Sequence, residues 1–321
     1  MSHDGKRMTL EPDVRAYLEQ LDLDAKPPVW EVPLETVRSN DRVLHGASPK
    51  TPVAQTKDIS IPASHGTIPA RVYEPQLPEG REEEMRGGVV FLHGGGFVFG
   101  DLETHDEAAR RLAAGSLATV VSIDYRLAPE HRFPASVEDS VTATQWVAEN
   151  APSLGIDPER IVVAGDSAGG NLAAVVARRL RDASGPRLRG QALVYPVTDM
   201  RPSSEWASRA ACAEGFGLSQ ATMNWFGEQY LNDLEDTEHP DASPIIVEDL
   251  RDLPPAFLLT VEFDPLRDEG NAYARRLIDA GVPTEHHELP GTIHGIMTNT
   301  ARFSSGDELW RRMLAWMRAT L

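Results

Sequence analysis

Short strand-like runs alternate with amphipathic stretches along most of this sequence. The strand-like runs are rich in apolar and β-branched residues and lie at positions 56–61, 68–73, 89–92, 119–123, 161–164, 192–195, 256–261 and 284–289. Stretches with apolar residues at helical spacing lie at 107–114, 136–149, 171–181, 269–280 and 308–319. This alternation predicts an α/β fold, in which helices flank a mostly parallel, twisted central sheet.

Two segments, residues 1–46 and 201–234, do not follow the alternation. Insertions at the carboxyl ends of parallel strands are where α/β folds build their binding sites. We therefore expect one domain over residues 1–321, with a core at about 47–200 and 235–321 and a helical cap made of both segments. Aromatic residues of the cap either form its own core or line a pocket. The candidate pocket residues are Phe97, Trp206, Phe216, Trp225 and Phe226.

Acidic residues outnumber basic ones by 49 to 31, which gives a formal net charge of −18. This balance argues against nucleic acid and anionic membrane surfaces as partners, because both are bound by basic patches. Four of the basic residues are lysines and the rest are arginines. A codon bias toward arginine is the favoured explanation, and adaptation to salt is the alternative.

The chain has one cysteine, Cys212, so no intrachain disulfide can form. Its first residues are polar and lack an apolar signal core, and no apolar run approaches the ~18 residues of a membrane-spanning helix. These features predict a cytoplasmic protein. The sequence also lacks H-E-x-x-H, P-loop, G-x-G-x-x-G and paired-cysteine motifs, so we expect neither a metal nor an organic cofactor.

The segment Gly165-Asp166-Ser167-Ala168-Gly169-Gly170 follows a strand-like run and precedes a helical one. A serine at a sharp strand-to-helix turn, with glycine two residues away on each side, fits a nucleophile elbow. Glycine is needed because side chains would clash in the strained turn. The helix N-terminus then points N–H groups at negative charge that forms beside Oγ. Ser167 is therefore the predicted nucleophile.

The segment His93-Gly94-Gly95-Gly96 follows the strand-like run at 89–92. Glycines after a strand let backbone N–H groups approach the oxygen that becomes negative during acyl transfer. The predicted donors to that oxygen are Gly95, Gly96 and Ala168. His93 precedes the serine in the sequence, and we expect it to orient the glycine loop by hydrogen bonding. A merely flexible loop is the alternative interpretation.

The other two members of a triad are expected after the last two strand-like runs. Asp264 comes just beyond the run at 256–261, and His294 follows the run at 284–289 and precedes a glycine. An acid in this place holds the imidazole in one tautomer and stabilises the imidazolium. The order Ser167, Asp264, His294 is also the order that accompanies a nucleophile elbow.

Several nearby residues are alternatives to this assignment. Glu262 is the rival acid, whereas Asp268 and Glu269 are expected in the first turn of the next helix. The adjacent histidines 286 and 287 lie inside a strand-like run and are interpreted as structural or solvated. His239, which precedes a proline, is a further candidate base.

These motifs resemble the hormone-sensitive lipase family of α/β-hydrolases, specifically its bacterial esterases with the GDSAGG elbow. The matching stretches span residues 87–300 and include 93–100, 125–130, 133–135, 195–196 and 264–270. One departure is Ile296, where the family often has phenylalanine. The resemblance implies a carboxylesterase with a Ser–Asp–His triad and a mobile cap, whose details do not carry over because the first ninety residues match only loosely.

The resemblance also implies a small-molecule ester substrate with a short to medium acyl chain, cleaved through an acyl-enzyme intermediate. It is compatible with a homodimer formed through a sheet edge. An amidase or deacetylase with the same triad is the alternative enzyme. A non-catalytic ligand-binding relative is a further alternative, but it would lack the serine or the histidine, and both are present here.

Overall fold

A computed structural model of the protein describes residues 9–23, 27–46, 49–80, 85–299 and 302–321. In this part of the chain, eight strands form one sheet in the order β1-β2-β4-β3-β5-β6-β7-β8. The strands are β1 (Gln55–Ala63), β2 (Gly66–Glu74), β3 (Arg86–Leu92), β4 (Thr119–Ile123), β5 (Ile156–Asp166), β6 (Gly190–Val194), β7 (Ala256–Phe263) and β8 (Thr284–Ile293). β2 pairs antiparallel with β1 and β4, and all the other pairs are parallel. Each expected strand overlaps an observed one, so the predicted α/β fold is confirmed.

The central strands of the sheet are buried on both faces. In β3, Val89 and Phe91 belong to one hydrophobic core, and Val90 and Leu92 belong to the other. Successive side chains of a strand point to opposite faces of the sheet, which explains this division. A parallel strand covered on both faces needs apolar residues at every position, so it appears in the sequence as an uninterrupted apolar run.

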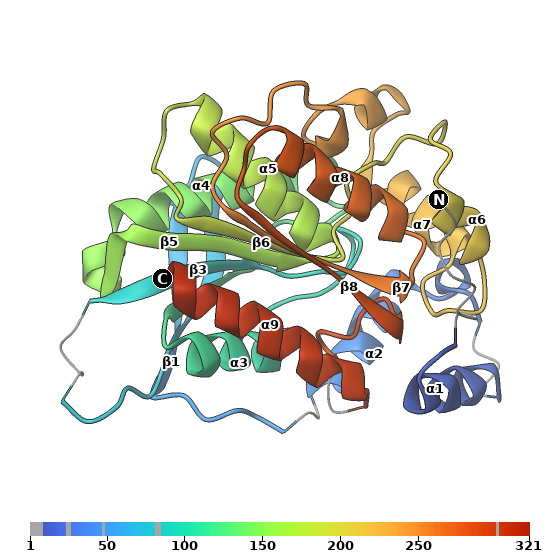
Figure 1. Cartoon of the computed structure of the whole chain (residues 1–321), viewed down its shortest axis with the longest axis horizontal. Coiled ribbons are helices and arrows are strands. Elements are labelled where there is room, and N and C mark those ends of the chain that lie inside the picture. Colours follow the sequence, from blue (N-terminus) through green and yellow to red (C-terminus); the bar gives the residue numbers. More distant parts are fainter. Residues whose placement is uncertain (1–8, 24–26, 47–48, 81–84, 300–301) are drawn as a thin grey trace.

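Helices form a layer on each side of the sheet (Figure 1). The lower layer in this view consists of α3 (Asp106–Ser116) and α9 (Ser304–Thr320). The upper layer consists of α4 (Ala135–Glu149), α5 (Ala168–Asp182) and α8 (Arg267–Asp279). Short 3-10 helices lie at η2 (Ala151–Leu154), η3 (Glu235–Glu238) and η4 (Pro244–Ile246). Because the strands from β3 to β8 run parallel, the residues that follow them meet at one edge of the sheet.

The two segments expected to form a cap are helical. The first contains α1 (Pro12–Leu23), η1 (Val29–Glu31) and α2 (Leu34–Gly46), and the second contains α6 (Ala207–Ala211) and α7 (Gln220–Tyr230). Figure 1 shows α6 and α7 at the end of the sheet toward which β7 and β8 point. Residues 1–8 and 24–26 of the expected cap lie outside the described residues.

Helix α1 packs against the core beside β8. The N–H of Glu11 donates to the carbonyl of Gly291 at 2.8 Å, and the Tyr17 ring meets the Phe303 ring edge-on at 5.2 Å. Val14 is fully buried and belongs to the same hydrophobic core as α9. This helix therefore supports the strand that leads to His294. Among the described residues, no helix has the length and apolarity needed to cross a bilayer.

Candidate active site

Ser167 lies in a strained turn between β5 and α5. Its φ of 56° and ψ of −117° fall outside the ordinary regions for a residue with a side chain. A Cβ atom on Gly165 would overlap the carbonyl of Gly169, and one on Gly169 would overlap the carbonyl of Leu92. The turn thus brings backbone so close together that glycine is required at both positions, which explains the motif read from the sequence.

Three side chains from separate strand ends form a continuous chain of hydrogen bonds. The Ser167 Oγ atom lies 2.9 Å from His294 Nε2, and His294 Nδ1 lies 2.8 Å from Asp264 Oδ2. Asp264 is fully buried, and its other oxygen accepts from the N–H of Leu266 at 2.9 Å. The structure therefore brings together the three residues that the sequence suggested for a triad.

The alternative residues have other contacts. The Glu262 carboxylate accepts from the N–H of Gly291 at 2.6 Å, which fixes the last part of β8. His286 bonds to Asn271, and His287 bonds to Glu285. His239 packs its ring edge-on against Phe133 at 5.3 Å. The contacts of His286 and His287 fit the structural role expected for them, and Glu262 and His239 make contacts other than a bond to Ser167 or His294.

The glycine loop after β3 is folded tightly beside Ser167. Gly95 has a φ of 119° and Gly96 a φ of 61°, and the N–H groups of Val98 and Phe99 close the turn on the carbonyl of Gly95. A Cβ atom on Gly95 would overlap the carbonyl of Phe99. Among the described residues, no acceptor pairs with the N–H groups of Gly95, Gly96 and Ala168. These donors are thus available to a ligand.

His93 bonds to this loop, as expected from the sequence. Its Nδ1 lies 2.8 Å from the carbonyl of Gly94, and its ring stacks on Tyr125 at 4.2 Å. Tyr125 in turn donates its hydroxyl to the carbonyl of His93 at 2.6 Å. Burial lowers the pKa of His93 to about 4, so the ring is neutral at ordinary pH. The loop rests on a neutral stacked pair.

A cavity of about 500 Å³ opens above Ser167. Among the candidate pocket residues, Phe97 and Phe226 lie in its wall. Further apolar lining comes from Val197, Met200, Leu218, Met223, Leu231 and Leu266.

The other three aromatic candidates are not among the described residues that line this cavity. Trp206 donates its indole N–H to Asp199 at 3.0 Å, Phe216 stacks on Phe263 at 5.0 Å, and Trp225 packs beside Phe226 at 5.4 Å. The alternative considered for these aromatics was a core within the second segment. Trp225 packs on a neighbour from that segment, whereas Trp206 and Phe216 contact Asp199 and Phe263 outside it.

A family model described as alpha/beta hydrolase fold matches residues 89–298 of the chain. The chain belongs to this family. The match begins in β3 and extends past His294, so it covers Ser167, Asp264, His294 and the glycine loop. The hydrolase therefore carries its site within the part of the chain that defines the family.

Relatives named as esterases extend this result. The hydrolase is 41% identical to Esterase LipI of Mycobacterium tuberculosis, over 90% of this chain and 89% of the relative. It is 38% identical to Carboxylesterase NlhH of the same species, over 97% of both chains. Among solved structures, a hyperthermophilic esterase from the archaeon Pyrobaculum calidifontis superposes with a TM-score of 0.90 at 41% identity, over 97% of this chain and 99% of that chain.

These comparisons confirm the resemblance to the esterases of the hormone-sensitive lipase group. The protein is a carboxylic ester hydrolase, and the alternative of a non-catalytic relative is set aside. Among the described residues, no cluster of His, Cys, Asp and Glu is arranged to hold a metal ion.

A buried ion pair lies behind Ser167 in this hydrolase. Asp166 Oδ1 accepts from the N–H of Gly94 at 2.9 Å and lies 3.4 Å from His105 Nε2. Burial by itself would raise the pKa of Asp166, but His105 and the Gly94 N–H outweigh it and lower the pKa. Burial would lower the pKa of His105, yet Asp166 raises it above its ordinary value. The pair joins the elbow to the glycine loop.

The contacts of two residues near Ser167 and His294 were not predicted, although both residues stand in stretches that carried the resemblance. The Tyr195 ring packs against His294 at 4.5 Å, and its hydroxyl accepts from the N–H of Met297 at 3.0 Å. Asp166 was noted as part of the elbow motif, but its link to Gly94 spans 72 residues of sequence. Neither contact has a local signal, because each joins two different loops.

Proposed function

We propose that this carboxylesterase cleaves short- to medium-chain acyl esters with a Ser167–His294–Asp264 triad. The observation that carries the proposal is the chain of hydrogen bonds, 2.9 and 2.8 Å long, that runs from Ser167 Oγ through the imidazole to the buried Asp264. Nucleophile, base and orienting acid in this geometry are what acyl transfer requires.

In this mechanism His294 Nε2 takes the proton from Ser167 Oγ as that oxygen attacks the ester carbonyl. Asp264 holds the Nδ1 proton, which fixes the tautomer and stabilises the imidazolium. The imidazolium then gives its proton to the leaving alkoxide, and an acyl group remains on Ser167. Water repeats the sequence, releases the acid and restores the serine.

The N–H groups of Gly95, Gly96 and Ala168 would hold the oxyanion of both tetrahedral intermediates. Their support is the tight turn of the glycine loop and the position of Ala168 in the first turn of α5, where helical N–H groups have no intrahelical acceptor. Each donor directed at the developing charge contributes about 3 kcal/mol.

The chain-length preference is argued from the cavity. Its volume of about 500 Å³ falls in the lower half of the ~300–1,000 Å³ range of small-molecule pockets. The wall is largely apolar and includes Phe226 and Met223 from α7. This supports α6 and α7 as a cap that encloses a short acyl or alcohol group, whereas no described residue of the first segment lines the cavity.

The test is hydrolysis of p-nitrophenyl butyrate by the wild type, by Ser167→Ala and by Ser140→Ala. Ser140 is a buried serine of α4 that bonds to its own helix, and it controls for the loss of a buried hydroxyl. We expect Ser167→Ala to lose roughly 10⁶-fold in kcat and Ser140→Ala to keep it. Activity that survives in Ser167→Ala would remove the nucleophile assignment.

A series from acetate to palmitate esters, together with p-nitrobutyranilide, tests the substrate class. Butyrate or hexanoate should be cleaved faster than palmitate in a micelle-free assay, and the ester faster than the anilide. A preference for palmitate would contradict the chain-length proposal, and faster cleavage of the anilide would favour an amidase. Light scattering would test the expected homodimer.

A further inference from the structure

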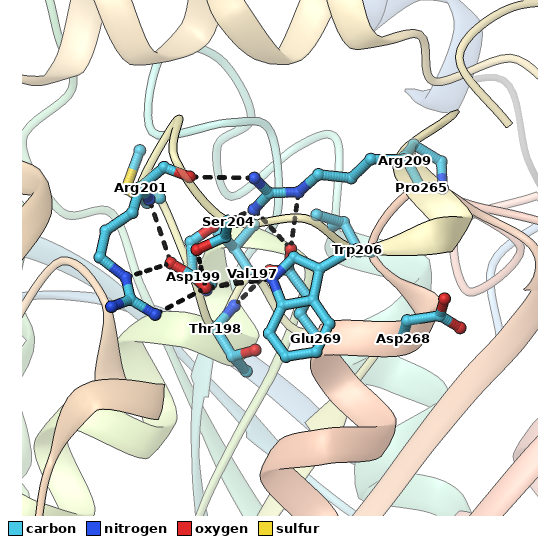
Figure 2. A network of polar contacts seen from close by, with 12 residues as sticks. Val197, Thr198, Asp199, Arg201, Ser204, Trp206, Arg209, Pro265, Asp268 and Glu269 are labelled. Atoms are coloured by element: carbon cyan, nitrogen blue, oxygen red, sulfur yellow. Dashed lines mark hydrogen bonds and ion pairs between the residues drawn. The ribbon is translucent and has the colours of Figure 1, made fainter. Parts of the chain in front are cut away.

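Several buried polar groups beside the triad take no part in the proposed chemistry. Ser208 and Glu269 are fully buried, and Asp199 is 1% exposed. They lie where α6 meets the start of α8 and the segment after β6, and Figure 2 shows Arg209 reaching toward Asp199 and Glu269. Since buried polar groups need partners, their bonds show which parts of the molecule they hold together.

Ser208 and Asp268 join the first turns of α6 and α8 to each other. The N–H of Ser208 donates to Asp268 Oδ2 at 2.8 Å, and the N–H of Asp268 donates to Ser208 Oγ at 3.1 Å. The first N–H groups of a helix have no acceptor within it, and here the side chain of each residue accepts a hydrogen bond from such an N–H group of the other helix. Two helices that are far apart in sequence are thereby fixed at their N-termini.

Ser208 also reaches the turn at residues 264–269 that carries Asp264 (the acid turn). Its Oγ donates to the carbonyl of Pro265 at 2.8 Å, and Pro265 directly follows Asp264. In the same turn, the carboxylate of Asp264 accepts from the N–H of Leu266, and the backbone carbonyl of Asp264 accepts from the N–H of Arg267. A shift of the Pro265 carbonyl would therefore move the carboxylate that faces His294.

The pair of Arg209 and Glu269 ties the same turn to the nucleophile. Arg209 Nη2 lies 2.7 Å from Glu269 Oε2, and the other carboxylate oxygen accepts from the N–H groups of Thr198 and Asp199 at 2.8 and 3.1 Å (Figure 2). The neighbouring Val197 N–H donates to the carbonyl of Ser167 at 3.2 Å. One network thus spans α6, the acid turn and the elbow.

We propose that Ser208, acting with Asp268 and the Arg209–Glu269 pair, is a positioning residue that sets the Asp264 carboxylate against His294. The cap would then have a second role besides enclosing substrate, because α6 holds one member of the triad in place. This proposal rests on the proposed function, since the position of Asp264 matters for catalysis only if Asp264 serves His294.

The experiment compares Ser208→Ala with Ser204→Ala in the full-length enzyme on p-nitrophenyl butyrate. Ser204 lies in the same cap segment and bonds to Asp199 at 2.6 Å, but it has no described bond to the acid turn. We expect Ser208→Ala to lose about tenfold in kcat with KM within about twofold, because a small displacement of a reacting group costs rate rather than binding. Ser204→Ala should keep wild-type kcat.

A second variant and a double variant separate positioning from folding. Asp268→Asn keeps the size of the side chain and a carbonyl acceptor but loses the charge, and we expect it to lower kcat as well. It tests the proposal even if Ser208→Ala folds poorly. In an Asp264→Asn background, Ser208→Ala should cause no further loss of kcat, because it acts through that carboxylate. Thermal unfolding would show that each variant is folded at the assay temperature.

The outcomes distinguish this proposal from the proposed function. If Asp264→Asn is nearly inactive while Ser208→Ala and Asp268→Asn keep kcat within twofold, the positioning role is overturned and the triad stands. If the Ser208→Ala loss recurs in the Asp264→Asn background, Ser208 does not act through Asp264. If Asp264→Asn itself keeps its activity, the triad fails and this proposal fails with it.

Discussion

The two sides of Ser167 are held in place by different kinds of interaction. On one side, the glycine loop at Gly94–Gly96 is fixed mainly by close contact of backbone with backbone and with aromatic rings, to which the Asp166 carboxylate adds one hydrogen bond from the N–H of Gly94. A Cβ atom on Gly94 would lie 2.6 Å from Asp166 Oδ2, and one on Gly96 would overlap the Phe226 ring. On the other side, the turn from Asp264 to Glu269 is fixed by side-chain hydrogen bonds and an ion pair.

This difference determines what each side tolerates. A loop specified by close contact fails when atoms are added, because a packed backbone has nowhere to move. A turn specified by polar partners fails when a partner is removed, because a buried group is then left unsatisfied. Substitutions that add volume and substitutions that remove a bond therefore probe the two sides separately.

The largest effect is expected for Asp264→Asn, which should lower kcat by about 10⁴-fold because the amide favours the wrong tautomer of His294. Glu262→Gln is the matched control, since Gln keeps an acceptor for the N–H of Gly291. It should lose less than about tenfold. Steady-state kinetics on p-nitrophenyl butyrate measures both, and a larger loss in Glu262→Gln would transfer the acid role to that residue.

On the other side of the nucleophile, Gly95→Ala should lower kcat by about 10²–10³-fold, the usual effect of losing one oxyanion donor. Gly281→Ala is its control, because Gly281 also has a positive φ, 81°, but has nothing within 4 Å of an added Cβ. The control should lose about 1 kcal/mol of stability with kcat unchanged. Equal losses of kcat in the two variants would show that backbone strain, rather than contact, is what matters.

The charge at Glu269 gives the acid side a pH dependence. Burial raises the pKa of Glu269 from 4.5 to about 7, despite the opposing effect of Arg209. The folded state thus binds this proton more tightly than the unfolded state does. The contribution of the proton to the free energy of unfolding is complete below the pKa of the unfolded state, and it is lost as pH rises through the pKa of the folded state. At 1.36 kcal/mol per unit, the loss is about 3 kcal/mol by pH 8.

Urea unfolding of the wild type and Glu269→Gln at several pH values between 4.5 and 8 measures this loss. The difference in free energy of unfolding should move in favour of Glu269→Gln by about 3 kcal/mol over that range, since Gln does not ionise. Asp199→Asn is the control from the same network, because the pKa of Asp199 is lowered and does not titrate there. A difference between wild type and Glu269→Gln that is constant with pH would contradict the prediction.

The smallest effect concerns the contact between α7 and the glycine loop. Gly96→Ala should lower kcat/KM because the new methyl group meets Phe226, and Phe226→Ala should partly restore it. A double-variant cycle should give a coupling of about 1–2 kcal/mol between the two positions. Additive effects would mean that α7 and the loop do not act on each other.

The fold, the elbow, the glycine loop and the order of Ser167, Asp264 and His294 could all be predicted from the amino-acid sequence. Each of these is a local pattern, in which an apolar run ends and a glycine or a reactive side chain follows. Parallel strands bring their carboxyl ends to one edge of a sheet, so residues that follow different strands meet without any further information. Their convergence could be predicted because the sheet does the assembling.

The sequence could not predict which aromatic residues face the cavity or how the turn from Asp264 to Glu269 is held. Phe226 lies in the wall while its neighbour Trp225 does not, and both have the same apolar character in the sequence. Ser208 and Pro265 are 57 residues apart, and Arg209 and Glu269 are 60 apart. Such contacts depend on how a cap segment packs on the core, and packing between distant segments leaves no periodic signal in either one.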